Sequence, residues 1–549
     1  MGRPTGTSQE AMTLVQEAFQ EISAADFFYR NRDIAGFTSP SRALYSTIRE
    51  LVENSLDACE TGGIPPDIYV RVSLESGPVD GPGTYVVRVE DNGIGVPGDI
   101  IPSAFGQVLY GSKYKLRQTR GTFGLGGKMA LLYGQITTHS EATIASSNNP
   151  RKRIVEYQIR IDIQQNKPVI IKHKQRSNPA HWRGTIVEFR TEADYSRAMA
   201  KILEYMKQTA IIVPYANITF VDPRGRLYKF VRGTTKVPKA PTETSPHPHG
   251  VDVETVQRLL KITEAKSLQE FLRSHFQRIG ETTARKFLHY AGLGQKKTPR
   301  NMGPDDVLKL VKAMKSYEDF LAPDPTCLSP LGEELLATGI KKELGVSQEQ
   351  IDDGTAFVTT LQRKPDTYAG FPFIVEIGLA STKAIQAEGR ILLFRFANKI
   401  PLLFDEASDV SWNVVNELID WRNYRVIPGE TPLAVFVHVC STKIPYKTVG
   451  KEFIADRPEV EHEILNALRE SGRSLKIYLS RREHLEREKK RLDVFEKYLP
   501  KVAVFSTRLA KEKKEPDVKQ LLKGVMKYTS EEEGEEATTR GSTAEEEQA

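Results

Sequence analysis

The segment RELVENSLDACE, residues 49–60, constrains the fold of this chain most, because it combines the spacing of a buried helix with the side chains of a polar site. Leu51 and Leu56 predict an apolar helix face. Glu50 and Asn54 stand four residues apart and therefore share another face. Carboxylates and amides are rarely buried without partners. This second face therefore lies in solvent or faces something that needs these groups.

Glu50 and Asn54 suit two chemical roles. A carboxylate near a polarised water can act as a general base, and an amide oxygen is a hard ligand suited to Mg²⁺. Many surface helices have the same spacing, so this pair alone is a weak signal. Two later segments strengthen it.

The segment EDNGIGVP, residues 90–97, follows a predicted strand. A carboxylate at Asp91 can accept a hydrogen bond from an exocyclic amino group such as that of adenine. Gly93 and Gly95 allow the backbone to turn tightly. The alternative is an ordinary hairpin turn, because Asp, Asn and Gly are common turn residues.

The segment RGTFGLGGKMALLYGQ is rich in glycine, which allows close approach to phosphates. A helix that begins near Lys128 would direct its N-terminal amides at them. The spacing GxxxxGK[ST] of a Walker A loop is absent. Ser112 and Lys113, just before this segment, could also reach phosphates, although a flexible basic loop explains them equally well.

The order ExxxNxxDA, DxGxG, GxxGxG resembles the GHKL ATPase family, which has an α/β-sandwich (Bergerat) fold and binds ATP under a lid. The resemblance implies ATP and Mg²⁺, with Glu50 as the general base, Asn54 as the Mg²⁺ ligand and Asp91 as the adenine contact. Thr185, in WRGTIVEF, resembles the family's later Gly-Thr element. The implied nucleotide-binding residues are Asn54, Asp91, Ser112, Lys113, Gly121, Thr122, Phe123, Gly124, Leu125, Gly126, Gly127, Lys128, Thr185 and one lysine from a later domain.

Within GHKL proteins, these motifs look most like those of the B subunits of type IIB DNA topoisomerases (topoisomerase VI, an archaeal enzyme). PHPHGVD and the helices after it resemble the helix–two-turn–helix domain of those subunits. RFANKIPLLFD and VHVCSTKIPYKTVGKE resemble their βαβ-type transducer, a module that sends a lysine into the ATP site. Lys443 is the predicted lysine, with catalytic relevance beside Glu50. Lys447 and Lys451 are close alternatives.

We therefore expect an α/β multidomain protein with a long charged helix at about 458–498. The aromatic run Phe27–Tyr29, outside the ATPase motifs, leaves room for a role in dimerisation. The predicted parts are an N-terminal strap (1–40), the ATPase domain (41–235), a linker and helix–two-turn–helix domain (236–315), a transducer with a long helix (316–500), and a partner-binding segment with an acidic, disordered tail (501–549).

The resemblance implies an ATP-driven dimer gate that relaxes and decatenates double-stranded DNA. No tyrosine nucleophile or acidic cleavage centre stands out in the sequence. In the family that the chain resembles, these groups lie on the A subunit, so the resemblance implies a topoisomerase VI A subunit as partner, in a heterotetramer with two copies of each. We expect the contact at about 492–528. The alternative is a MutL-like repair clamp. A sensor kinase is disfavoured, because the first histidine, His139, follows the lid segment, and an Hsp90-type chaperone would lack the helical insert.

Composition limits the remaining classes. The 549 residues carry a net charge of +6, and the tail is acidic, which permits a nucleic-acid partner. The three cysteines are far apart, so neither a zinc site nor a disulfide framework is indicated. No apolar run approaches the ~18 residues of a membrane span, and we expect a cytoplasmic protein without a membrane partner.

Overall fold

The computed structural model describes residues 22–111, 116–121, 124–386, 389–448, 450–511 and 517–518. The chain divides into two compact units between Ser474 and Leu475, and each unit is described by itself. The first unit holds both sheets. The predicted domain boundaries at 41, 236, 316 and 501 stay predictions.

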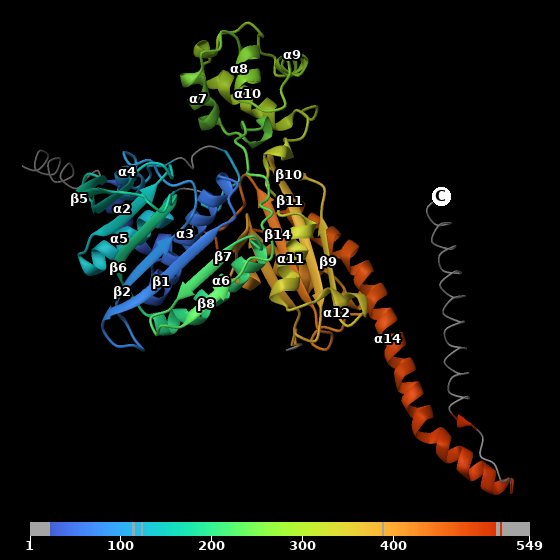
Figure 1. The fold of residues 1–549 in the computed structure, drawn as a ribbon. Coiled ribbons are helices and arrows are strands. Elements are labelled where there is room, and N and C mark those ends of the chain that lie inside the picture. Colours follow the sequence, from blue (N-terminus) through green and yellow to red (C-terminus); the bar gives the residue numbers. More distant parts are fainter. Residues whose placement is uncertain are drawn as a thin grey trace, which may run out of the picture. The chain divides into compact units, whose positions relative to one another are not determined.

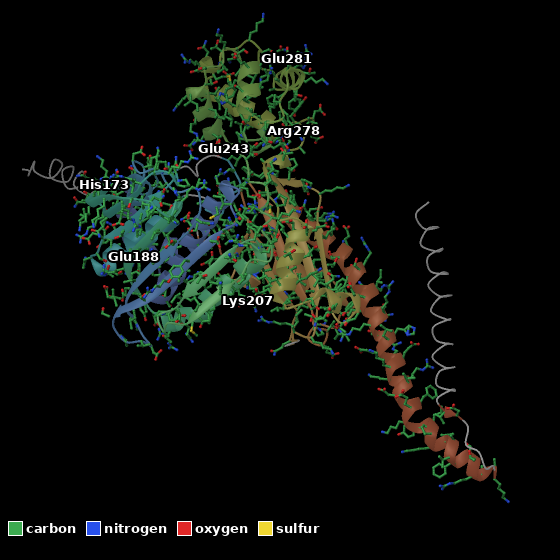
Figure 2. The ribbon with its side chains drawn as sticks, in the orientation of Figure 1. His173, Glu188, Lys207, Glu243, Arg278 and Glu281 are labelled. Atoms are coloured by element: carbon green, nitrogen blue, oxygen red, sulfur yellow. The ribbon has the colours of Figure 1, made fainter. Side chains whose placement is uncertain are left out.

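An eight-stranded sheet forms the N-terminal part of the first unit (Figure 1). Its strand order is β5-β4-β3-β6-β2-β1-β7-β8, and only the β1–β7 pair is parallel. The edge strand β5 is largely exposed and carries His173 (Figure 2). The segments TYVVRVED, KRIVEYQIRIDI, PVIIKHK and GTIVEFR alternate or run apolar, as strands do, and they form β2, β4, β5 and β6 as predicted. The strands are β1 (Asp67–Ser76), β2 (Gly83–Glu90), β3 (Ala142–Ser147), β4 (Ile154–Asp162), β5 (Lys167–Arg176), β6 (Gly184–Ala193), β7 (Asn217–Val221) and β8 (Leu227–Phe230).

In the described part of the chain, five helices accompany this sheet, and α3 is the central one. Ser39 caps α3 by accepting a hydrogen bond from the Arg42 amide, and Pro40 occupies its first turn, as helix starts favour. Ile48 and Val52 are fully buried. The helix packs against α5, α6 and β6. The helices are α2 (Ala24–Arg30), α3 (Pro40–Thr61), α4 (Ile101–Gly106), α5 (Gly126–Thr138) and α6 (Tyr195–Ile212).

The predicted helical insert is confirmed, and it has a core of its own. Phe271, Phe287 and Leu310 are fully buried within it. Its helices are α7 (Val253–Ile262), α8 (Leu268–His275), α9 (Glu281–Tyr290) and α10 (Pro304–Ser316).

A second, six-stranded sheet follows, with β9 paired to β11 and the order β10-β11-β14-β12-β13. β11 and β14 are almost entirely buried, which explains their continuous apolar sequences. β12 and β14 are parallel and joined by a crossover containing α13, so the predicted βαβ-type arrangement is confirmed. The elements are α11 (Glu333–Glu343), α12 (Gln348–Asp352), β9 (Phe357–Gln362), β10 (Asp366–Tyr368), β11 (Phe371–Ser381), β12 (Leu392–Ala397), β13 (Ile400–Pro401), α13 (Val410–Asn413) and β14 (Ala434–Ser441).

The predicted long charged helix is α14 (Pro458–Leu509), which is longer than expected. Within the first unit, Arg363 pairs with Glu463 and Glu470 on this helix. Gly472 does not interrupt it. A Cβ at this position would stand 2.8 Å from a Tyr424 ring carbon, so glycine allows a close approach here.

Candidate active site

Glu50 and Asn54 lie on α3 beside the first residues of α5. A Cβ on Gly126 would stand 1.7 Å from Glu50 Oε2, and one on Gly127 would stand 3.1 Å from Asn54 Nδ2. The two glycines therefore let the N-terminus of α5 approach the polar face of α3. The first amides of a helix lack intrahelical partners and carry partial positive charge, so this end of α5 suits an anionic group.

Three buried charged groups surround Glu50. Arg49 Nη2 donates to Glu50 Oε1 at 2.8 Å, and Arg49 Nη1 donates to the Gly450 carbonyl at 3.0 Å. Burial opposes the charge of Arg49, but the Glu50 and Glu53 carboxylates outweigh it and raise the arginine's pKa above its ordinary value. Burial raises the pKa of Glu53, although the Lys451 ammonium opposes this shift. These contacts join α3 to the segment that follows β14.

The lysine that reaches this group is Lys451. Its Nζ lies 3.6 Å from Glu53 Oε2 and 3.9 Å from Glu50 Oε1. The predicted Lys443 does not lie in this group: its side chain is exposed, with Nζ 5.0 Å from the centre of the Phe371 ring. Lys447 is also exposed and pairs with Asp456. All three lysines follow one strand within nine residues, so spacing alone could not distinguish them.

Asp91 lies at the end of β2, and its carboxylate is almost completely buried. Oδ1 accepts hydrogen bonds from the amides of Gly93, at 2.9 Å, and Thr185, at 3.2 Å. Oδ2 accepts from the Ser55 hydroxyl at 3.1 Å. Burial raises the pKa of Asp91 to about 6, although these hydrogen bonds oppose the shift. The structure thus brings together Asp91 and Thr185, 94 residues apart.

Two glycines near Asp91 are needed for close backbone contact. Gly184 has φ +145°, and a Cβ there would stand 1.9 Å from the Asp91 carbonyl oxygen. Gly95 has φ +68°, and a Cβ there would stand 2.2 Å from the Ser147 carbonyl oxygen. The segment around Asp91 is therefore locked against β3 and β6, which is more than the hairpin alternative requires.

The glycine-rich segment is described only in part. The predicted residues Ser112, Lys113, Thr122 and Phe123 lie outside the described residues. Gly121 is described, Gly124 has φ +60°, and Leu125 precedes α5. The helix begins at Gly126, two residues before the predicted start. Lys128 is buried on it, and its ammonium donates to the Tyr110 carbonyl.

Sequence reasoning missed Arg49 and Arg120. Asp57, which continues the stripe of Glu50 and Asn54, accepts a hydrogen bond from Arg120 Nη1 at 3.0 Å. Arg120 Nη2 donates to Glu60 at 2.5 Å. These partners are about 60 residues apart, and no local spacing could have indicated them. The adjacency of Arg49 and Glu50 was visible, but not the burial that makes it significant.

Two family models match this chain, and each match covers strands of one of the two sheets. Residues 40–193 match the family described as "Histidine kinase-, DNA gyrase B-, and HSP90-like ATPase", and residues 323–491 match "Topoisomerase VI B subunit, transducer". The B subunit of type 2 DNA topoisomerase 6 from Saccharolobus shibatae is 44% identical over 489 residues, covering 89% of this chain and 90% of its own. The chain belongs to this family of B subunits. The Pyrobaculum aerophilum member is 43% identical and covers 96% of this chain and 98% of its own.

Family membership makes the chain the ATP-hydrolysing subunit of a type II DNA topoisomerase, with a GHKL ATPase fold and a transducer. Among solved structures, the N-terminal domain of a DNA repair protein aligns with a TM-score of 0.36 at 13% identity, covering 82% of this chain and 98% of that chain. Such a weak likeness does not bear on the fold. In the described ranges, no helix combines the length and apolar character that a bilayer crossing requires.

Proposed function

We propose that the chain is an Mg-ATP-driven dimer gate for a type IIB topoisomerase. The observation that carries the proposal is the meeting of Glu50, the glycine-lined start of α5 and Lys451, a residue of the transducer. The proposed catalytic residue Glu50 and the transducer residue Lys451 thus belong to one cluster of side chains.

The residues present suit Mg-ATP. Gly126 carries no side chain, so backbone amides at the start of α5 can face phosphates. Asn54 is exposed there and offers an oxygen to Mg²⁺, which would neutralise phosphate charge. Asp91 supplies a buried acceptor for the adenine amino group, and Thr185 lies beside it.

Glu50 is the proposed general base, which takes a proton from the attacking water. Arg49 holds its carboxylate through a charge-assisted hydrogen bond of 2.8 Å. Lys451 is the proposed transducer lysine, because its ammonium already lies within 3.9 Å of Glu50. We therefore assign Lys451 the phosphate contact first expected of Lys443.

Self-dimerisation on nucleotide binding is supported by exposed apolar side chains near the N-terminus. Phe27 and Tyr29 on α2 are 41% and 44% exposed, and Ile34 is 44% exposed. Phe28, by contrast, packs against the core. We propose that the predicted strap, 1–40, contacts a second copy through these side chains; residues 1–21 of it lie outside the described residues.

The partner A subunit is proposed to bind at about 492–528, and residues 512–516 and 519–528 of this segment lie outside the described residues. In the second unit, the described helix exposes apolar side chains three or four residues apart, which places them along one stripe. A contiguous apolar stripe on the surface of a helix marks a site where a partner can bind. The stripe comprises Val494, Tyr498, Val502, Phe505 and Leu509, with exposed fractions between 51% and 90%.

The proposal predicts a division of labour. The purified chain should neither cleave nor relax supercoiled DNA with Mg-ATP. With an A subunit that supplies a nucleophilic tyrosine and acidic metal ligands, it should support ATP-dependent relaxation and decatenation. Truncation after residue 490 should preserve nucleotide binding and abolish capture of that subunit. Relaxation by the lone chain would refute the division of labour, and capture by the truncated chain would refute the proposed interface.

The named relatives favour this function over the MutL-like repair clamp. They cover 89% and 96% of this chain. The chain also contains the helical insert α7–α10, which the clamp does not need. Nucleotide-dependent closure without any effect of an A subunit on DNA topology would favour the clamp instead.

A further inference from the structure

The three residues before Gly121, here called the loop stem (118–120), are held by the transducer as well as by the ATPase domain. The Gln118 side-chain amide forms two hydrogen bonds with the backbone of Ser329. Nε2 donates to the Ser329 carbonyl at 3.1 Å, and the Ser329 amide donates to Oε1 at 2.7 Å. Both residues are buried. The stem is therefore fixed to a segment 211 residues along the chain.

A second connection comes from the turn between β12 and β13. Asn398 Nδ2 donates to the Thr119 carbonyl at 3.2 Å and to the Ser441 carbonyl at 3.0 Å. Asn398 and Lys399 have φ values of +48° and +62°, which non-glycine residues seldom adopt. Such conformations persist where the surroundings impose them, and they gather at functional positions.

The third connection is a group of buried charges. Glu60, near the end of α3, accepts hydrogen bonds from Arg120 of the stem, at 2.5 Å, and from Lys399 Nζ, at 3.1 Å. Burial would raise the pKa of Glu60, but these two cations outweigh it and hold that pKa at about 2. The carboxylate is thus ionised and bridges the two domains. The Arg120 carbonyl also accepts a hydrogen bond from Lys451 Nζ at 2.9 Å.

The turn is connected in the other direction to the centre of the second sheet. The Lys399 amide donates to His438 Nε2 at 2.9 Å, which leaves the ring proton on Nδ1. His438 Nδ1 donates to Glu376 Oε2 at 2.7 Å. Glu376 also accepts the amides of Leu331, at 3.0 Å, and Gly332, at 2.5 Å.

These bonds have a consequence for a possible metal site. Glu376, His438 and Cys440 lie close enough to share a metal ion. Both ring nitrogens of His438 are already engaged with protein groups, so the cluster serves as a hydrogen-bonded link between β11, β14 and the turn.

We infer that Gln118 and Asn398 are positioning residues that couple the loop stem to the transducer. This inference rests on the proposed ATP site, because the stem leads directly into the glycine-rich phosphate segment. Any nucleotide-dependent shift of the stem must move Ser329 and the 398–399 turn, or break these buried hydrogen bonds. Lys451 also contacts the stem, through the Arg120 carbonyl, but the proposed coupling does not require Lys451 to contact a phosphate.

The test uses Asn398→Gly and Gln118→Met in the full-length chain. Glycine accepts the left-handed backbone at 398, and methionine has nearly the volume of glutamine, so neither change strands a buried charge. Asp405→Gly, at an exposed position with φ +47°, is the matched control. Calorimetry measures affinity for a non-hydrolysable ATP analogue with Mg²⁺. Hydrogen exchange measures how the analogue changes amide protection in β11 and β14.

The control and the wild type should bind the analogue and show the same change in protection. Asn398→Gly should bind within about threefold of wild type and lose at least half of that change, because the stem no longer holds the turn. Gln118→Met should do the same. Normal affinity with an unchanged exchange response in Asn398→Gly would overturn the inference. Failure of the wild type to bind the analogue would overturn the proposed function as well.

Discussion

Gly126→Ala should reduce ATP turnover while leaving the fold intact. The new Cβ would stand 1.7 Å from Oε2, 2.0 Å from Cδ and 2.5 Å from Cγ of Glu50. These atoms belong to a flexible side chain, so Glu50 moves and the backbone does not. Misplacing a catalytic group by about 1 Å costs on the order of 10²-fold in rate. We therefore expect kcat to fall by roughly 10²-fold.

The same substitution changes stability little, which separates the catalytic effect from unfolding. Alanine favours a helix over glycine by about 0.5–1 kcal/mol, and this gain offsets part of the cost of moving Glu50. Gly127→Ala makes the same backbone change, but its Cβ would stand 3.1 Å from Asn54 Nδ2 and 3.9 Å from Leu51 Cδ2, and not against Glu50.

The assay is steady-state ATPase activity together with analogue affinity and thermal unfolding. Gly126→Ala should bind the analogue, unfold near the wild-type temperature and turn over slowly. Gly127→Ala should keep more of the rate than Gly126→Ala, because its Cβ meets Asn54 at 3.1 Å and not Glu50 at 1.7 Å. Wild-type turnover in Gly126→Ala would show that Glu50 does not act from the observed position.

Other predictions follow from the same contacts. Adenine-nucleotide affinity should fall below pH 6, where Asp91 becomes protonated, and Asp91→Asn should remove that part of the pH dependence; parallel titration curves would refute the role. Lys451→Met should lower ATP turnover far more than Lys443→Met, and equal losses of turnover would refute the assignment of Lys451 as the transducer lysine. Gly184→Ala should destabilise the fold by several kcal/mol in denaturant melts, because its Cβ would meet backbone at 1.9 Å. The low pKa of Glu60 should add roughly 3 kcal/mol to the free energy of unfolding above about pH 4.5, and this contribution should be lost as the pH falls toward 2. Glu60→Gln should make the free energy of unfolding nearly independent of pH across that range.

The sequence predicts the elements well where a local pattern determines them. Apolar or alternating segments identified four of the eight strands of the first sheet, β2, β4, β5 and β6. The apolar segments FPFIVEIGLA and LAVFVHVCSTK likewise predict the buried strands β11 and β14, because burial on one or both faces leaves these patterns. Helix spacing placed Glu50 and Asn54 on one face, and the structure brings both to the start of α5.

Local sequence patterns do not predict which side chains meet when residues far apart in the chain form the contact. Nothing in the sequence near Lys443 or Lys451 shows which ammonium reaches Glu53, because that depends on how the loop after β14 folds. The charged group around Glu60 joins residues up to 339 positions apart. Its members look like solvated surface residues until the packing between the domains is known.

The account is tested most directly by the turnover of Glu50→Gln. Glutamine keeps the shape of the side chain and removes the base. Glu188→Gln, on β6 (Figure 2), is the matched control, since Glu188 pairs with Arg88 on the sheet. We expect Glu50→Gln to bind the ATP analogue as the wild type does and to lose hydrolysis by roughly 10²-fold or more. Hydrolysis by Glu50→Gln at the rate of the control would contradict the assignment of Glu50 as the base.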